Sequence, residues 1–117
     1  MSRRLPNSEA ATVSPLKLTG YLLSAAHPRG RGKARFFTHF GFSTDAPGTL
    51  ERALLLHAQE NAVVRTIETP HGTKYEIEGP LQAPGGRKPV LKSVWIIERH
   101  GDVPRFVTAM PGPRLRE

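Results

Sequence analysis

The densest group of chemically active side chains lies in residues 27–33, which read His-Pro-Arg-Gly-Arg-Gly-Lys. One histidine, His27, is followed there by three cations, Arg29, Arg31 and Lys33. Cationic side chains and the free N–H groups at the start of a helix attract phosphate and other anions. Histidine exchanges a proton near neutral pH, so we predict that His27 acts as an acid or a base on an anionic substrate. The alternative is a solvent-exposed turn histidine that precedes a proline.

Three residues far along the chain are further candidates for this chemistry. Lys74 lies in an expected strand, Arg87 in a glycine-rich loop and Thr108 in the last expected strand. Metal-independent cleavage of a phosphodiester needs a base for the 2′-hydroxyl, an acid for the leaving oxygen and cations for the developing charge. Each of the three residues is also common at ordinary surface and strand-edge positions. The predicted catalytic residues are His27, Lys74 and Thr108, and the predicted substrate-binding residues are Arg29, Arg31, Lys33, Arg87 and Trp95.

The sequence excludes several other kinds of site. Because the chain has no cysteine, it has no disulfide, no thiolate zinc site and no cysteine nucleophile. Its five histidines never fall at the short spacings of metal ligands. The glycines of residues 29–32 follow no expected strand, so they form no dinucleotide-binding fingerprint, and no Walker-type loop or nucleophile elbow is present. We therefore predict no metal and no cofactor, and we expect His57, on an apolar helix face, to be a partly buried structural residue.

Length and charge indicate a single basic domain. The chain has 117 residues, with 17 Lys and Arg against 10 Asp and Glu, a net charge of +7. Seven basic residues and one acidic residue lie in residues 1–40, and seven against three lie in residues 83–117. This distribution predicts a polyanionic partner, above all RNA, although a basic surface can also serve solubility alone. No apolar run reaches the ~20 residues of a membrane span, and no secretory signal is recognisable, so we expect a cytoplasmic protein without membrane contact.

Three short helices are expected to precede the strands. Ser14 is a suitable N-cap for a first helix that ends near residue 25 or 26. The second helix is expected over residues 33–40, with three phenylalanines on one face and Gly41 as its C-cap. Thr44 or Asp45 is expected to cap the third, which continues to Glu60. The predicted organisation is a flexible arm (1–13), one domain (14–111) and a basic tail (112–117).

Period-two alternation then predicts strands over residues 62–69, 73–79, 90–98 and 103–110, with an irregular loop over 80–89. The predicted fold is α+β, with two or three amino-terminal helices packed on a four-stranded antiparallel meander. An even-numbered turn around His100 and Gly101 would pair Trp95 with Phe106 and Ser93 with Thr108. A groove lined by this tryptophan and the hydroxyl pair, beside basic residues, is suited to a nucleotide. The alternative is the rim of an ordinary core.

A series of separated motifs resembles an uncharacterised bacterial domain family. The resemblance covers roughly residues 15–111, and members of the family are small proteins or the carboxyl ends of larger toxins, often encoded beside a small immunity-like protein. The motifs are His27-Pro28, Gly30, Lys33-Ala34, Phe36-Phe37, Gly72-x-Lys74-Tyr75, Gly79-Pro80-Leu81, Gly86-Arg87, Val94-Trp95-Ile96-Ile97 and Pro104-Arg105-x-Val107-Thr108-Ala109.

The helices-then-meander order is similar to that of the barnase–EndoU–colicin–RelE group of metal-independent ribonucleases, which is an analogy of fold. The resemblance implies a ribonuclease-like toxin domain, an RNA substrate and an acidic immunity-like or antitoxin partner. The resemblance also implies that the functional site contains His27, Lys33, Lys74, Arg87 and Thr108. The alternative function is a non-catalytic nucleic-acid-binding or protein-interaction module. Such a module would bind RNA in a salt-sensitive way without turnover, or would not bind it at all.

Overall fold

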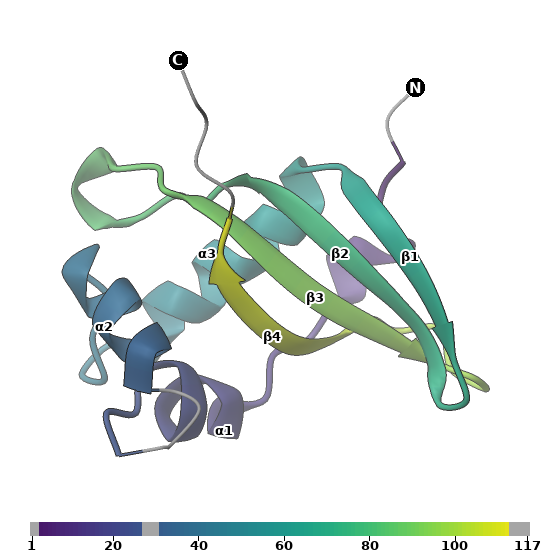
Figure 1. The fold of residues 1–117 in the computed structure, drawn as a ribbon, viewed down its shortest axis with the longest axis horizontal. Helices are drawn as coiled ribbons and strands as arrows, with labels where there is room; N and C mark the ends of the chain where they lie inside the picture. The colour runs from purple at the N-terminus through teal and green to yellow at the C-terminus, as the bar shows by residue number, and fades with distance from the viewer. Residues whose placement is uncertain (1–2, 27–30, 113–117) are drawn as a thin grey trace.

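A computed structural model describes residues 3–26 and 31–112 of the chain. Its helices precede a four-stranded sheet in which every neighbouring pair of strands is antiparallel. The strands follow one another in the order β1-β2-β3-β4, so the sheet is a meander (Figure 1). The predicted α+β fold is therefore confirmed. The strand bounds are β1 (Val63–Thr69), β2 (Gly72–Pro80), β3 (Val90–Glu98) and β4 (Arg105–Pro111).

The helical part consists of short elements with recognisable ends. The first helix, α1 (Pro15–Lys17), continues into a π-helical turn, η2 (Leu18–Leu22), and is followed by α2 (Arg31–His39) and α3 (Pro47–Glu60). The Ser14 side chain accepts a hydrogen bond from the backbone N–H of Leu16, as expected of an N-cap. Gly41, two residues after the end of α2, has a φ of 96°, a conformation that glycine adopts without strain. Two single 3₁₀ turns are also present: η1 (Ser8–Ala10) precedes α1, and η3 (Pro84–Gly86) lies between β2 and β3.

The start of α3 differs from the expected cap. Neither Thr44 nor Asp45 caps the helix, because its first flanking residue is Ala46, which has no capping side chain. Ser43 instead accepts a hydrogen bond from the backbone N–H of Asp45, at 3.0 Å, and forms the turn before the helix. Pro47 then occupies the first helical position, where its missing N–H is not needed.

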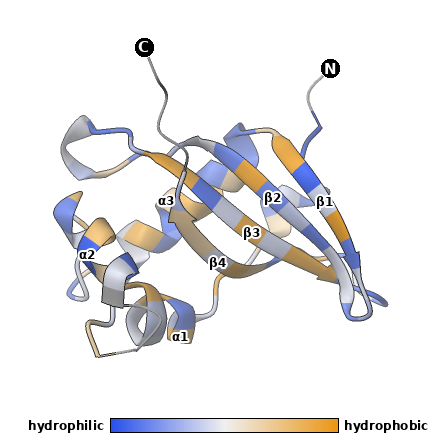
Figure 2. Cartoon of the chain, in the orientation of Figure 1, coloured by the Kyte–Doolittle hydropathy of each residue, from blue (hydrophilic) through white to orange (hydrophobic). Residues whose placement is uncertain are grey.

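One face of the sheet is covered and the other is open. Helix α3 lies behind the sheet in Figure 1, and apolar residues of β3 and β4 stand out in Figure 2. The covered face contains fully buried side chains from α3 and three strands, among them Leu50, Leu54, Ile77, Leu91 and Trp95. On the opposite face, Lys92 lies 3.5 Å from Glu76 and 3.6 Å from Glu78. No helix of the described residues lies over that face (Figure 1).

Residues 3–13, expected to form a flexible arm, are packed against the sheet. Leu5 and Val13 are buried in the core. The Thr12 backbone donates to the carbonyl of Pro104 and accepts from the N–H of Phe106, so it covers part of the free edge of β4. A strand edge carries unpaired backbone groups, and pairing them stabilises the segment that lies beside it.

The register between β3 and β4 changes within the hairpin. Trp95 pairs with Phe106, as predicted, but Ser93 pairs with Ala109 and not with Thr108. The register shifts by one residue between Val94 and Trp95, because β4 contains an extra residue there, a β-bulge. A one-residue shift moves the following side chains to the other face of a sheet. Thr108 is therefore opposite Val94, on the open face, and the predicted hydroxyl pair with Ser93 does not form.

Candidate functional site

Trp95 does not line a groove. It is fully buried, and its indole N–H donates to the hydroxyl of Ser93 at 2.8 Å. Its ring meets that of Phe106 edge to face, with centroids 5.3 Å apart. A ligand in solvent cannot reach a side chain with no exposed surface. The predicted role of Trp95 in substrate binding is therefore wrong, because its side chain lies inside the core and not at the rim of a groove.

His57 completes a buried polar network with Ser93 and Trp95. The imidazole Nε2 lies 3.1 Å from the carbonyl oxygen of Gly79 and 3.0 Å from that of Leu91, so this nitrogen must carry a hydrogen. Nδ1 then accepts from the Ser93 hydroxyl, 2.9 Å away. Burial lowers the pKa of His57 below its ordinary value of 6.5, against the opposing effect of the two carbonyl groups. The expected structural role of His57 is confirmed.

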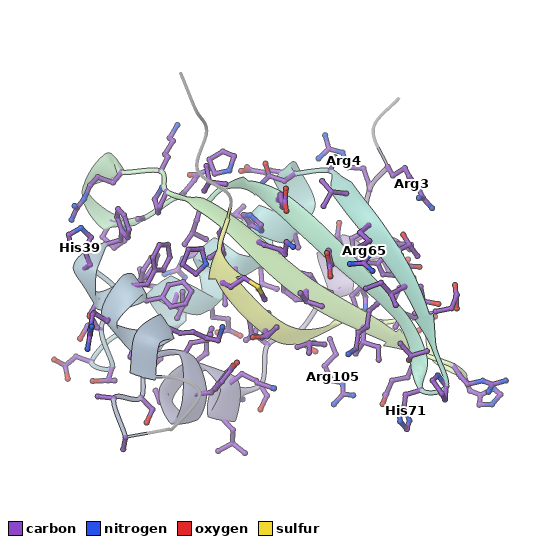
Figure 3. All side chains as sticks on the ribbon, in the orientation of Figure 1. Arg3, Arg4, His39, Arg65, His71 and Arg105 are labelled. Atoms are coloured by element: carbon purple, nitrogen blue, oxygen red, sulfur yellow. The ribbon has the colours of Figure 1, made fainter. Side chains whose placement is uncertain are left out.

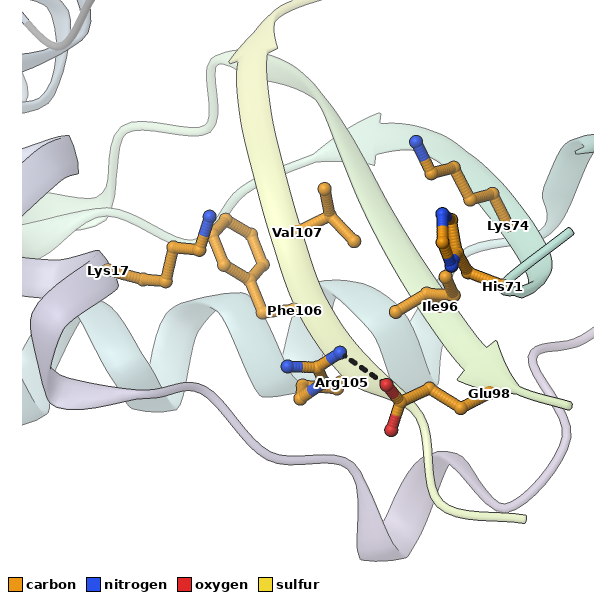
Figure 4. Close-up of a pocket in the computed structure, with 8 residues that line it drawn as sticks. All are labelled: Lys17, His71, Lys74, Ile96, Glu98, Arg105, Phe106 and Val107. Atoms are coloured by element: carbon orange, nitrogen blue, oxygen red, sulfur yellow. Dashed lines mark hydrogen bonds and ion pairs between the residues drawn. The ribbon is translucent and has the colours of Figure 1, made fainter. Parts of the chain in front are cut away.

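An open pocket of about 390 Å³ lies at the open face of the sheet, opposite the face that α3 covers, and toward the β1–β2 turn (Figure 4). Its lining combines basic side chains from three separate parts of the chain with an apolar floor. The lining residues are Lys17, His71, Lys74, Ile96, Glu98, Arg105, Phe106 and Val107. Four of these side chains, three permanent cations and one histidine, are suited to a phosphate.

Local backbone structure positions the pocket's histidine. His71 lies in the tight turn between β1 and β2, where the Thr69 hydroxyl accepts from the backbone N–H groups of His71 and Gly72. The carbonyl of His71 accepts from the N–H of Arg99, which ties this turn to the end of β3. Gly72 has a φ of 149°, and a Cβ there would collide with the backbone of Ile97. The His71 side chain is exposed at the end of the sheet, far from His39 (Figure 3).

Lys74 and Arg105 flank the pocket's aliphatic floor. Lys74 of β2 and Arg105 of β4 both lie opposite Ile96 of β3. Arg105 forms an ion pair of 2.9 Å with Glu98, but both side chains are more than half exposed. Such a surface pair contributes little free energy, so a phosphate can take the guanidinium from the carboxylate.

Lys17 connects this pocket with a second cluster around Tyr21. The ammonium of Lys17 lies 5.2 Å from the centre of the Tyr21 ring, and that of Lys33 lies 6.0 Å from it. The Tyr21 hydroxyl is 2.9 Å from the hydroxyl of Thr108. Two of the predicted site residues, Lys33 and Thr108, thus meet at Tyr21, and Lys17 links them to the pocket that contains Lys74.

Arg87, another predicted binding residue, joins neither of these clusters. Arg87 donates to the carbonyl of His39 at 2.9 Å and lies 5.0 Å from the centre of the Phe40 ring, so it fastens its loop to the end of α2. Arg31 begins α2. His27 and Arg29 lie outside the described residues.

Sequence reasoning missed Lys17, Tyr21, His71 and Arg105 as members of a site. A signal existed for Arg105, because the even-numbered turn already places it opposite Ile96. Lys17 and Tyr21 carry no such signal, since only the packing of α1 and η2 against β4 brings them to the sheet. Among residues 3–26 and 31–112, no group of three or more His, Cys, Asp or Glu side chains is arranged to hold a metal ion. No helix in these ranges is long and apolar enough to cross a membrane.

The fold has a counterpart among solved structures. A chain of a contact-dependent growth inhibition toxin–immunity protein complex from Klebsiella pneumoniae 342 superposes with a TM-score of 0.69 and 18% sequence identity. The match covers 92% of this chain and 97% of that chain. At this identity the likeness establishes the fold alone. A comparison with curated proteins gives no match. Residues 4–113 match the domain of unknown function DUF6883, so the chain belongs to this family, which is an uncharacterised one as expected.

Proposed function

We propose that the chain is a ribonuclease-like toxin domain that cleaves RNA without a metal ion and is neutralised by an acidic immunity-like protein. The observation that carries this proposal is the convergence of Lys17, His71, Lys74 and Arg105 on one open pocket. The net charge of +7 supports a polyanionic substrate. The fold likeness to a chain of a toxin–immunity complex supports the toxin role.

The proposed reaction uses the 2′-hydroxyl of RNA as its nucleophile. His71 takes the proton of this hydroxyl, the 2′-oxygen bonds to the adjacent phosphorus, and the bond from phosphorus to the 5′-oxygen breaks. The Lys74 ammonium gives a proton to the departing 5′-oxygen. Arg105 and Lys17 stabilise the negative charge that develops on the phosphate oxygens. The products are a 2′,3′-cyclic phosphate and a 5′-hydroxyl end.

Cleavage of total RNA in the presence of EDTA tests the proposal. We expect cleavage by the natural sequence and a loss of about a hundredfold or more in rate for His71→Ala and for Lys74→Ala. Lys88→Ala is the matched control, because Lys88 is exposed in the β2–β3 loop and lies outside the pocket. Absence of cleavage by the natural sequence, or equal rates for all three variants, would contradict the proposal.

A fourth variant, His27→Ala, decides between the two histidines. His27 is the base predicted from the sequence, and His71 is the base proposed from the pocket. If His71 is the base, His27→Ala retains most of the rate. Loss of cleavage in His27→Ala with retention in His71→Ala would transfer the role of base to His27.

The second candidate function is RNA binding without turnover. It is favoured by one feature of the pocket: Lys17, Lys74 and Arg105 can hold phosphates whether or not His71 accepts a proton. This function predicts salt-sensitive binding of RNA and no new RNA ends in the EDTA assay. The logarithm of the affinity would fall by about 0.7 per neutralised phosphate for each tenfold rise in salt.

The acidic partner is proposed to cover the same pocket. An acidic protein surface complements a basic one and competes with RNA for it. The test co-expresses the chain with a candidate acidic immunity-like protein and measures whether the complex forms, dissociates at high salt and fails to cleave RNA. A complex that cleaves RNA as fast as the free chain would contradict this part of the proposal.

A further inference from the structure

The Tyr21–Thr108 hydroxyl pair lies near two lysines, Lys17, to which the proposed reaction assigns a role, and Lys33, to which it assigns none. The two hydroxyl oxygens are 2.9 Å apart and half-buried. Lys17 and Lys33 both place their ammonium groups against the Tyr21 ring, within 6.0 Å of its centre. Two cations at one aromatic ring repel each other, although the ring attracts each of them. An anion bound beside the ring would relieve this repulsion.

No carboxylate supplies that anion within the described part of the chain. There, the ion pairs between side chains involve Lys92 and Arg105, and neither Lys17 nor Lys33 takes part in one. Hydroxyl groups and ammonium groups are both donors to phosphate oxygens. The cluster therefore has the donors of a phosphate site, and among residues 3–26 and 31–112 no carboxylate forms an ion pair with its two lysines.

The β4 bulge is what brings Thr108 to this cluster. Without the extra residue, Thr108 would lie opposite Ser93 on the covered face. With it, Thr108 lies opposite Val94 on the open face and reaches Tyr21, while Val107 lines the neighbouring pocket. Bulges commonly redirect side chains next to functional sites.

Lys17 makes the two clusters neighbours, because it lines the pocket and also contacts Tyr21. Successive phosphates of one RNA strand could therefore occupy both places. We propose that the Tyr21–Thr108 pair, with Lys17 and Lys33, forms a second phosphate subsite, so that the substrate is a single-stranded RNA segment with at least one phosphate beyond the reacting one. This inference rests on the proposed function. It gives Thr108, expected from the sequence to be catalytic, a role in binding.

Binding of uncleavable RNA tests this subsite apart from catalysis. Fluorescence anisotropy compares a 2′-O-methyl dinucleotide with a 2′-O-methyl hexanucleotide on the full chain. We expect Lys33→Ala and Thr108→Val to weaken hexanucleotide binding by about tenfold and to leave dinucleotide binding unchanged. Lys33→Ala should also reduce the slope of log affinity against log salt by about 0.7, the loss of one phosphate contact.

Arg35→Ala is the matched control on α2, because Arg35 is exposed and lies outside both clusters. Thr108→Val keeps the volume of the side chain, and an unchanged thermal unfolding midpoint verifies that each variant is folded.

Equal losses of affinity for both RNA lengths, or no loss of affinity for either, would overturn the subsite. If RNA cleavage is absent but the length-dependent binding is found, the subsite stands and the ribonuclease proposal fails. If cleavage occurs and Lys33→Ala and Thr108→Val bind normally, the subsite fails alone.

Discussion

The imidazole Nδ1 of His57 and the hydroxyl oxygen of Ser93 lie 2.9 Å apart, although 36 residues separate them in the chain. This hydrogen bond joins α3 to β3, and the Ser93 hydroxyl also accepts from the indole of Trp95. The hydroxyl is therefore both a donor and an acceptor, and each atom of the network has a partner. A satisfied buried network of this kind holds the helix and the sheet in one relative position.

Acid should destabilise the protein through His57. Burial lowers the pKa of this histidine in the folded state below its ordinary value of 6.5, so the unfolded chain binds more protons below that pH. The stabilisation is fully present above the unfolded pKa and is lost as the pH falls from 6.5 toward the lowered pKa. Urea unfolding should show that the free energy of unfolding falls as the pH is lowered from about 8 to about 5.

In His57→Gln this pH dependence should be smaller, whereas His100→Gln, a change in an exposed turn, should retain it. The opposite slope would contradict the neutral state of His57.

Replacement of Ser93 by alanine should lower stability more than the small change in volume suggests. The indole N–H of Trp95 would lose its acceptor, and His57 Nδ1 would lose its donor, both at buried positions. An unsatisfied buried polar group costs about 1–3 kcal/mol. Urea unfolding at neutral pH measures the loss. Thr73→Ala, on a half-buried β2 residue whose hydroxyl bonds to an exposed carboxylate, is the matched control and should cost well under this amount. Equal costs for the two variants would contradict the importance of the network.

Gly72→Ala should destabilise the hairpin that holds His71. A Cβ at Gly72 meets the backbone of Ile97, and the φ of 149° is strained for any residue with a side chain. We expect a loss of about 2 kcal/mol or more in the free energy of unfolding. Gly48→Ala in α3, where a Cβ meets nothing within 4 Å, should instead leave stability unchanged or raise it by up to about 1 kcal/mol. Equal stability of the two variants would contradict the strained turn.

The fluorescence of Trp95 should not report RNA binding. The chain has one tryptophan, and it is fully buried. Acrylamide should therefore quench its emission weakly, and saturating RNA should leave the emission maximum in place. Unfolding in urea should restore strong quenching, which serves as the control. Strong quenching of the folded protein would show that the indole is accessible, as the groove predicted from the sequence required.

The order and type of the main elements could be predicted from the sequence because their signals are local. The period-two alternation of residues 90–98 corresponds to the observed β3 (Val90–Glu98). Ser14 and Gly41 act through backbone conformations within a few residues of themselves, so the N-cap of α1 and the end of α2 followed from residue type. The structural role of His57 also followed, because an apolar helix face predicts burial.

The candidate site depended on contacts between distant residues. Lys17 and Tyr21 reach β4 only because α1 and η2 pack beside it, and no local pattern encodes that distance. The β4 bulge moved Thr108 from the face of Trp95 to the open face, since one extra residue reverses every later side chain of a strand. The sequence by itself determined the α+β order, the basic charge and the family. Only the tertiary structure decided which cations share a pocket, because side chains far apart in the chain meet through packing, and packing is a property of the whole fold.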